Sequence, residues 1–222
     1  MPLILNIDTS TEQASICLSE NVQCLGMRSN DTQKDHASWL HPAIEGLLKD
    51  TGRNLVDLKA VGITIGPGSY TGLRIGMATA KGLCYALNIP LIGINTLEAM
   101  ASAALNEETD YICPMIDARR MEVFTAIYDK NLVPLLDPCA MILNEQSFFD
   151  LLQTKKIVFY GSGKNKLEAI IDQSNARFKN IIFNASHLYV IIYSKFIKYD
   201  FMPLAYLEPL YLKEHYTHNS GK

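Results

Sequence analysis

One glycine-rich segment has the composition of an anion-binding corner. Residues 66–82, GPGSYTGLRIGMATAKG, hold five of the thirteen glycines and follow the apolar segment AVGITI, which we expect to be a buried strand. A helix opened by Ser69 or Thr71 after such a strand can direct backbone N–H groups at an anion. The spacing matches neither standard phosphate loop, because a Walker A loop ends in Gly-Lys-Ser/Thr and a dinucleotide fingerprint has a glycine where Thr71 stands. The segment by itself therefore predicts a tight strand-to-helix corner.

In each half of the chain, one aspartate ends the first predicted strand. Asp8 and Asp117 each follow an isoleucine, and a new strand is expected six residues further on in both halves. Such an acid pair could serve an ATP-dependent phosphotransferase or a hydrolase. Backbone N–H groups can approach a nucleotide closely only where small residues follow each acid. Residues 9–12 are TSTE and residues 118–121 are ARRM, so neither segment contains a glycine. The two arginines could bind an anion, but a solvated turn is favoured.

A third short segment, residues 161–164 (GSGK), follows a predicted strand and could be the remnant of an adenosine-binding turn, although any strand-to-helix turn has this composition. Together these features predict a vestigial nucleotide cleft rather than a working one. Its candidate residues are Asp8, Thr9, Ser10, Asp117, Arg119, Gly161 and Gly163.

Histidine, serine and cysteine positions predict neither a metal site nor a catalytic residue. His36 and His41 are five residues apart, which leaves their side chains about 140° apart around a helix. Pro42 is tolerated only near a first helical turn, so we expect His36 to precede the helix. The remaining histidines, His187, His215 and His218, are scattered. No serine stands in a nucleophile elbow, and Cys84 on a helix face predicts packing.

Two helices of the first half carry features of a contact surface. Gly72, Gly76, Ala80 and Cys84 recur every fourth residue and line one nearly bare helix face. A glycine inside a helix costs roughly 0.5–1 kcal/mol relative to alanine, so Gly76 should permit a close approach, either inside the fold or between subunits. Residues 38–49 carry an apolar stripe beside the single tryptophan, Trp39, which could seal the core or anchor a partner.

The order of predicted elements is the same in both halves. Periodicity predicts strands at 3–9, 14–19 and 22–27, a helix near 38–49, the strand before Gly66, the glycine-faced helix, a strand at 90–95 and one more helix. The second half has strands at 111–117, 123–128 and near 138–143, a helix around 146–152, a strand at 156–160, a short helix after Gly163 and a long helix at 186–199. A duplicated βββαβα lobe with an acidic residue at each hairpin is the plan of the actin-like ATPase and sugar-kinase superfamily.

We therefore predict an α/β fold of two lobes. The N-terminal lobe covers residues 1–104 and carries the partner-docking helices, and a smaller C-terminal lobe covers residues 105–222, with a tail that can pack back on the first lobe. The first ten residues, MPLILNIDTS, have no basic opening and contain Asn6 and Asp8, so they predict a strand rather than a signal peptide.

Composition and charge limit the compartment and the partners. The 222 residues are 48% hydrophobic and 19% charged, and no apolar run approaches the roughly 18–20 residues of a membrane span. Five scattered cysteines form neither a disulfide framework nor a zinc ribbon, so we expect a cytoplasmic protein. A formal net charge of -3 without a basic block argues against a large nucleic-acid surface on this chain alone.

Four segments resemble the bacterial TsaB (YeaZ) family. They are NIDTS at residues 6–10, GPGSYTGLRIG at 66–76, DARR at 117–120 and PLYLK at 209–213, and the second is the most specific. The resemblance covers nearly the whole chain. It implies a subunit of the machinery that places threonylcarbamoyl on N6 of the adenosine next to the anticodon, in tRNAs reading codons that begin with A. In that family the subunit is a shortened, non-catalytic relative of the enzyme TsaD, and TsaE is an ATP-hydrolysing third partner.

The resemblance also implies a docking face on two helices of the first lobe, here around residues 39–48 and 71–87. The expected partner-interface residues are Trp39, Leu40, Ile44, Leu48, Gly72, Leu73, Gly76, Ala80 and Leu83. On this reading Gly76→Leu should abolish association and leave the fold largely intact. We expect no cofactor on this chain alone, ATP only at a shared surface of the complex, tRNA contact only through the complex, and no membrane contact.

The competing hypothesis is a self-sufficient ATP-dependent phosphotransferase or hydrolase of the actin-like superfamily, including the older glycoprotease-type assignment. It is disfavoured because the acid pair lacks surrounding glycines. The sequence leaves open whether the chain forms a homodimer when its partner is absent, whether nucleotide binds at an interface, which residues contact tRNA, and whether the Gly72–Gly76–Ala80 face is exposed or internal.

Overall fold

The first lobe is built on a five-stranded sheet in the order β3-β2-β1-β4-β5. The computed structural model describes residues 1–30 and 35–213. The five strands are β1 (Leu3–Asp8), β2 (Ala14–Glu20), β3 (Gln23–Asn30), β4 (Leu58–Gly66) and β5 (Leu91–Asn95). The three strands β1 to β3 form an antiparallel meander, whereas β4 and β5 run parallel to β1.

The second lobe repeats this topology. Its strands are β6 (Tyr111–Asp117), β7 (Glu122–Tyr128), β8 (Pro134–Ile142), β9 (Ile157–Tyr160) and β10 (Ala176–Phe178). Their order, β8-β7-β6-β9-β10, matches that of the first lobe, with the same alternation of antiparallel and parallel pairs. The predicted duplicated α/β fold is therefore confirmed. Of the strands in the described residues, only the short β10 was absent from the sequence prediction, because three residues carry too little periodicity to be recognised.

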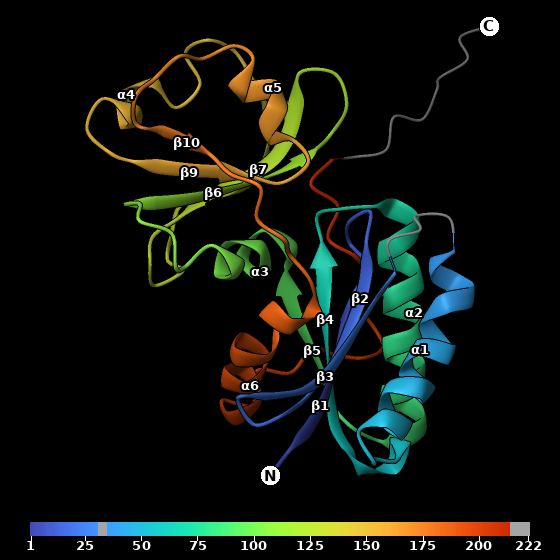
Figure 1. Cartoon of the computed structure of the whole chain (residues 1–222). Coiled ribbons are helices and arrows are strands. Elements are labelled where there is room, and N and C mark those ends of the chain that lie inside the picture. Colours follow the sequence, from blue (N-terminus) through green and yellow to red (C-terminus); the bar gives the residue numbers. More distant parts are fainter. Residues whose placement is uncertain (31–34, 214–222) are drawn as a thin grey trace, which may run out of the picture.

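Helices cover both faces of the first sheet (Figure 1). Successive side chains of β1 point to opposite faces. Leu3, Leu5 and Ile7 lie in the same apolar cluster as the buried residues of α1 (His36–Asp50) and α2 (Tyr70–Leu87), whereas Ile4 lies in the cluster that contains Ile192 of α6 (Tyr189–Ile197). Helix α3 (Thr96–Ala103) lies between the two lobes (Figure 1). The remaining short elements are η1 (Leu55–Asp57), α4 (Phe149–Leu152), α5 (Lys164–Glu168) and η2 (Ala185–His187).

The predicted boundary of the second lobe needs a correction in its last part. Helix α6 packs on the first sheet, where a side chain at Gly62 would overlap Ile192. After α6 the chain stays on the first lobe, because Met202 bridges to Leu91 and the Leu210 amide donates to the Ile65 carbonyl oxygen at 2.7 Å. The long terminal helix and residues 198–210 therefore belong with the first lobe by their contacts.

The start of α1 also differs from the prediction. His36 is the first residue of the helix and is buried, and Pro42 lies inside the helix rather than in its first turn. Pro42 has no N–H, so the Ser38 carbonyl is left without its helical donor. Both residues are exposed, so water can satisfy that carbonyl and the helix continues. Among the residues described, no helix has the length and apolar character of a membrane span.

Candidate functional site: the cleft between the lobes and the α1–α2 face

Asp8 ends β1 and is completely buried. Its Oδ1 accepts hydrogen bonds from the Ser10 amide at 3.1 Å, the Ser10 hydroxyl at 2.6 Å and the Thr64 hydroxyl at 2.6 Å. Its Oδ2 has no hydrogen-bond partner among the described residues. Burial raises the pKa of Asp8, although the hydrogen bonds from Ser10 and Thr64 and the charge of His36 oppose this shift. The first acid of the pair is therefore enclosed by its own loop.

The glycine-rich corner is filled by the loop that follows β1. Ser69 caps α2 by accepting a hydrogen bond from the Gly72 amide at 3.2 Å, and the Ser69 amide donates to the Ser10 carbonyl at 2.7 Å. A Cβ at Gly68 would overlap the Ser10 carbonyl oxygen, and a Cβ at Gly72 would overlap that of Thr9. The predicted tight corner is confirmed. Its glycines make room for the chain's own backbone.

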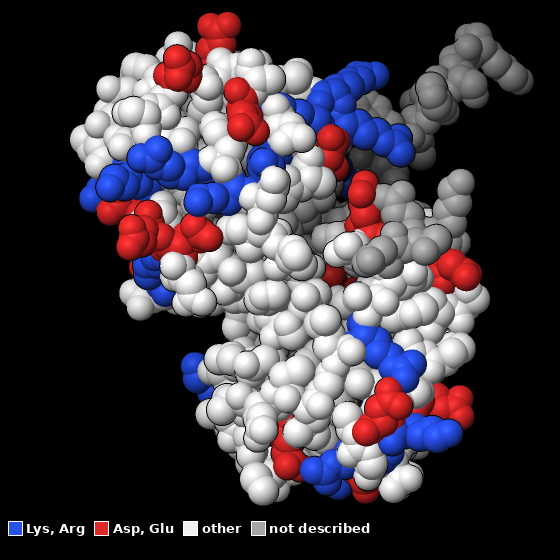
Figure 2. All heavy atoms as spheres, viewed as in Figure 1, with Lys and Arg blue, Asp and Glu red and all other residues white. Residues whose placement is uncertain are grey.

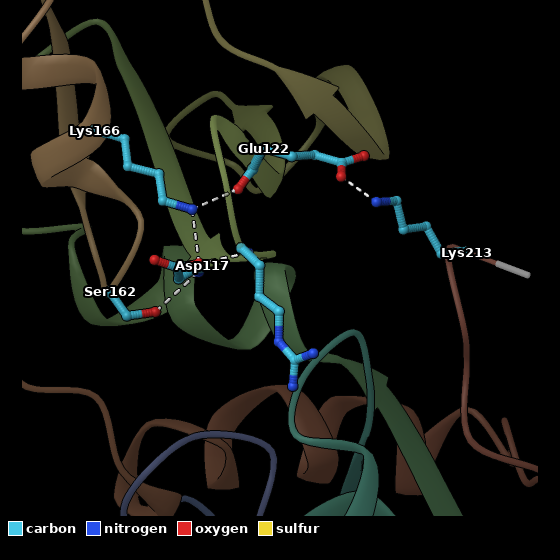
Figure 3. A network of polar contacts seen from close by, with 6 residues as sticks. Asp117, Glu122, Ser162, Lys166 and Lys213 are labelled. Carbon is cyan, nitrogen blue, oxygen red and sulfur yellow. Dashed lines mark hydrogen bonds and ion pairs between the residues drawn. The ribbon is translucent and has the colours of Figure 1, made fainter. Parts of the chain in front are cut away.

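Asp117 ends β6 on the opposite side of the cleft and is paired (Figure 3). Its Oδ1 accepts from Lys166 Nζ at 2.7 Å and from the Arg119 amide at 2.6 Å, and its own amide donates to the Ser162 hydroxyl at 3.0 Å. Burial would raise the pKa of Asp117, but the Lys166 ammonium and the Arg119 N–H outweigh it and hold this pKa below its ordinary value. Lys166, which the sequence did not single out, also donates to the Glu122 carbonyl at 2.9 Å.

The turn after Asp117 contains two residues in the left-handed region of backbone space. Arg119 and Arg120 have φ values of 70° and 48°. Neither is a glycine, and each left-handed residue of this kind costs roughly 1–2 kcal/mol. The hydrogen bond from the Arg119 amide to Asp117 and the pairing of β6 with β7 hold this turn in place.

The tail of the chain joins the two lobes. Tyr211 packs against Tyr70 with ring centroids 5.3 Å apart, and its hydroxyl accepts from Arg74 Nε at 3.1 Å. Two residues later Lys213 forms an ion pair with the Glu122 carboxylate of β7 (Figure 3). The tail is therefore anchored on α2 and contacts the second lobe beside the Asp117 network.

A cavity of about 750 Å³ lies between these two acid sites. Of the predicted cleft residues, Ser10, Asp117, Arg119 and Gly161 line it, whereas Asp8, Thr9 and Gly163 are buried and are not part of its lining. The sequence did not predict its apolar wall, which consists of Met100, Ile116, Phe124, Ile181, Ile182 and Phe183. The Ile-Ile-Phe segment has the composition of a core strand, yet Ile182 is 73% exposed.

The glycine face of α2 is internal. Gly72, Gly76 and Ala80 are buried, and a Cβ at Gly76 would overlap the Thr9 hydroxyl and lie 3.2 Å from Ile63 Cδ1. These residues therefore cannot contact a partner, and their assignment to the partner interface is corrected here. The expectation that Gly76→Leu leaves the fold intact is also wrong, because a leucine has no space at this position.

The exposed side of α1 and α2 forms a separate groove of about 420 Å³. Of the predicted interface residues, Ile44, Leu48 and Leu83 line it, while Leu40 and Leu73 are buried in the core and Trp39 is partly buried beside it. Two apolar side chains of η1 stand exposed: Leu55 (39%), which lines the groove, and Val56 (73%). The remaining lining residues are His41, Glu45, Lys49, Arg53 and Asn54.

Charged side chains of both signs are interspersed on the face drawn in Figure 2. A row of Lys and Arg crosses the smaller lobe, and Asp and Glu lie directly beside it. Lys179 and Glu107 form an ion pair at 3.9 Å. Within residues 1–30 and 35–213, no group of three or more His, Cys, Asp and Glu side chains could hold a metal ion. His215 and His218 lie outside the described residues.

Comparisons with known proteins agree with one another. A family model described as "TsaD: tRNA N6-adenosine threonylcarbamoyltransferase" matches residues 15–184. The chain is 35% identical over 129 residues to the tRNA threonylcarbamoyladenosine biosynthesis protein TsaB of Escherichia coli (strain K12), covering 58% of this chain and 55% of that protein. It is 36% identical over 125 residues to the protein of the same name in Bacillus subtilis (strain 168), covering 56% and 54%. The chain thus spans about half the length of the curated relatives it matches.

A solved structure extends the similarity to the complete fold. A Pseudomonas aeruginosa protein described as uncharacterized, with similarity to peptidase YEAZ, superposes with a TM-score of 0.86 at 23% identity, covering 96% of this chain and 100% of that chain. At this level of identity the comparison establishes the fold alone.

Proposed function

The chain belongs to the TsaD-type tRNA N6-adenosine threonylcarbamoyltransferase family, with similarity to its TsaB (YeaZ) members, and on this basis we propose that it is a non-catalytic subunit in threonylcarbamoyladenosine formation. In this proposal the modification is made on N6 of the adenosine next to the anticodon, in tRNAs reading codons that begin with A. A TsaD-like subunit carries out the transfer, and the present chain supports it by forming a heterodimer.

The observation that carries the non-catalytic role is the enclosure of Asp8. A carboxylate that serves a nucleotide or its metal ion must reach the cleft, whereas Asp8 is buried beneath Ser10 and is not part of the cavity lining. Its Oδ1 already accepts from Ser10 and Thr64, and its Oδ2 is buried. Asp117 is likewise engaged by Lys166. The two acids therefore maintain the fold of their loops, and the chemistry is assigned to the partner.

The proposed docking face is the exposed side of α1 and α2 with η1. Supporting observations are the groove between these elements, the exposed Leu55 in its lining, and Val56, the next residue of η1, which is 73% exposed. Burial of apolar surface drives most protein association. Two copies of this chain pair through the same face when the TsaD-like subunit is absent, since the face fits a homologous lobe.

The other parts of the proposal concern the complex as a whole. A TsaE-like ATPase is the third partner, ATP binds at a surface shared between subunits, and tRNA is contacted only through the assembled complex in the cytoplasm. The formal net charge of -3 supports the last point, because a nucleic-acid surface requires a concentration of basic side chains.

The decisive experiment combines depletion in the native cell with a nucleoside assay for threonylcarbamoyladenosine. Depletion should remove the modified nucleoside, and the wild-type chain should restore it. Leu55→Asp places a charge on the docking face and should prevent both restoration and co-elution with the TsaD-like subunit. Leu135→Asp is the matched control, because Leu135 is a leucine of the second lobe that is 55% exposed and lies outside this face.

The competing enzyme hypothesis makes the opposite prediction for the acid pair. Under our proposal Asp8→Asn and Asp117→Asn still support the modification, and the purified chain alone does not turn over ATP. Robust ATP hydrolysis by the isolated chain, lost in both variants, would establish a self-sufficient phosphotransferase or hydrolase instead.

A further inference from the structure

Two cysteine thiols meet between β2 and β3. The sulfur atoms of Cys17 and Cys24 are 3.3 Å apart. Cys17 is fully buried and Cys24 is half-buried. Two other cysteine sulfurs contact oxygen atoms instead: Cys84 contacts the Pro90 carbonyl at 3.5 Å and Cys113 contacts the Thr125 hydroxyl at 3.2 Å.

The register of the hairpin explains this contact. Ser19 of β2 lies opposite Cys24 of β3, and Leu18 lies opposite Gly26, so Leu25 has no partner and forms a bulge. Cys17 and Ser19 point to the same face of β2 because side chains alternate along a strand. Cys24 therefore faces Ser19 directly and Cys17 diagonally, within reach of a side-chain contact. A disulfide requires a sulfur separation of about 2.05 Å, so the two sulfurs need to approach by roughly 1.3 Å.

We propose that Cys17 and Cys24 form a reversible intramolecular disulfide when the folded chain meets a small-molecule disulfide of the glutathione class. The Cys24 thiolate attacks one sulfur of glutathione disulfide, that S–S bond breaks, and one glutathione leaves and takes up a proton. The Cys17 sulfur then attacks the Cys24 sulfur of the mixed disulfide, and the second glutathione leaves with the proton that Cys17 loses. In sum, two protein thiols are oxidised and one glutathione disulfide is reduced to two thiols.

The order of the two steps follows from exposure. Cys24 is partly exposed to solvent, whereas Cys17 is fully buried in the apolar cluster that also contains Ile4 and Ile192. Burial also raises the pKa of the Cys17 thiol, which slows any direct reaction of that sulfur with an oxidant in water. Inside the mixed disulfide the Cys24 sulfur is already next to Cys17, so the second step needs no encounter in solution.

The site lies next to packing that sets the position of α1. On the other face of β3, a Cβ at Gly26 would lie 3.0 Å from Leu47 Cδ1 and 3.2 Å from Thr51 Cγ2. The disulfide would fix the β2–β3 hairpin in the register that this packing requires, beneath the helix assigned to partner docking.

The test uses the full chain, reduced, desalted and incubated with glutathione disulfide under native conditions. The expected product is lighter by about two mass units, with two of the five thiols lost. Cleavage after Glu20, which lies between the two cysteines, should leave the flanking peptides joined until a reductant is added. The equilibrium constant for disulfide formation with glutathione disulfide should be about tenfold higher for the folded chain than for the urea-unfolded chain, because the fold brings the thiols together.

Single substitutions separate the two steps. Cys17→Ser should stop at one glutathione attached to Cys24, and Cys24→Ser should form no internal disulfide. Cys139→Ser is the control, since Cys139 is also half-buried and its loss should leave the wild-type product unchanged. The proposal is overturned if the wild-type chain stops at a mixed disulfide, if Cys139 is the residue oxidised, or if the Cys17–Cys24 bond forms only in urea.

Discussion

Gly76→Ala on α2 is the sharpest test of the internal glycine face. The added methyl group would overlap the Thr9 hydroxyl and lie 3.2 Å from Ile63 Cδ1. Thr9 cannot move without loss, because its hydroxyl donates to the Gly72 carbonyl at 2.8 Å and the residue is fully buried. The same helix offers a matched control in Gly82, where a Cβ would meet nothing within 4 Å.

The magnitude follows from three opposing contributions to the free energy of unfolding. Alanine is favoured over glycine inside a helix by about 0.5–1 kcal/mol. Overpacking of a filled interior costs about 1–3 kcal/mol, and loss of the Thr9 hydrogen bond costs about 0.5–1.5 kcal/mol. Gly76→Ala should therefore destabilise the chain by about 0.5–4 kcal/mol, whereas Gly82→Ala should stabilise it by about 0.5–1 kcal/mol.

Urea unfolding of the wild type and both variants measures these changes. A double-mutant cycle with Thr9→Ala isolates the steric part, since that substitution removes the hydroxyl that overlaps the new methyl group. The Thr9→Ala/Gly76→Ala variant should be more stable than the sum of the single effects predicts, by about 1–2 kcal/mol.

Equal stabilisation by Gly76→Ala and Gly82→Ala would refute the reasoning. It would mean that the Gly72–Gly76–Ala80 face has free space beside it and could be open to a partner. Additive effects in the cycle would refute the specific role of Thr9, even if Gly76→Ala were destabilising.

Three further predictions concern buried polar groups and the tail. Tyr160 is fully buried and its hydroxyl has no hydrogen-bond partner among the described residues, so Tyr160→Phe should raise the free energy of unfolding by about 1 kcal/mol; a loss of stability in urea would reveal a contact of this hydroxyl. Because burial raises the pKa of Asp8, the wild type loses stability as pH rises from about 4 through that raised pKa. The free energy of unfolding of Asp8→Asn relative to that of the wild type should therefore increase between pH 4.5 and 7.5. A difference in the free energy of unfolding that stays constant over this range, measured with urea, contradicts the prediction. Lys213→Met should speed amide exchange in residues 203–213 while changing the free energy of unfolding by less than about 1 kcal/mol. Lys195→Met, which breaks the ion pair with Asp200, is the control and should leave that exchange unchanged. Equal exchange in both variants would show that the order of residues 203–213 does not depend on the ion pair with Glu122.

The fold could be predicted because its signals are local. The apolar run of β1, the alternating apolar residues of β2, the serine cap of α2 and the repeated Ile-Asp ends of β1 and β6 each depend on a few neighbouring residues. Repetition of the same order in two halves then restricted the topology. Pro42 misled the prediction because the cost of a proline depends on whether the freed carbonyl can reach water, and that exposure is set by tertiary packing.

Only part of the candidate site could be predicted from the sequence. The types and strand positions of Asp8 and Asp117 were predicted, but one hydrogen bond to Asp8 comes from Thr64, fifty-six residues away, and the partner of Asp117 is Lys166 on α5. The apolar wall of the cavity joins residues from α3, β7 and the segment before η2. Such long-range neighbours leave no periodic signal in a single sequence.

Local patterns in the sequence specify that this chain folds as two lobes of one repeated topology, with a glycine-rich corner after β4 and an aspartate at each first strand end. Long-range packing specifies which way the glycine face of α2 points, which lobe receives α6 and residues 198–210, and how deeply Asp8 is buried. Periodicity records which residues share a face, whereas burial depends on what the rest of the chain packs against that face.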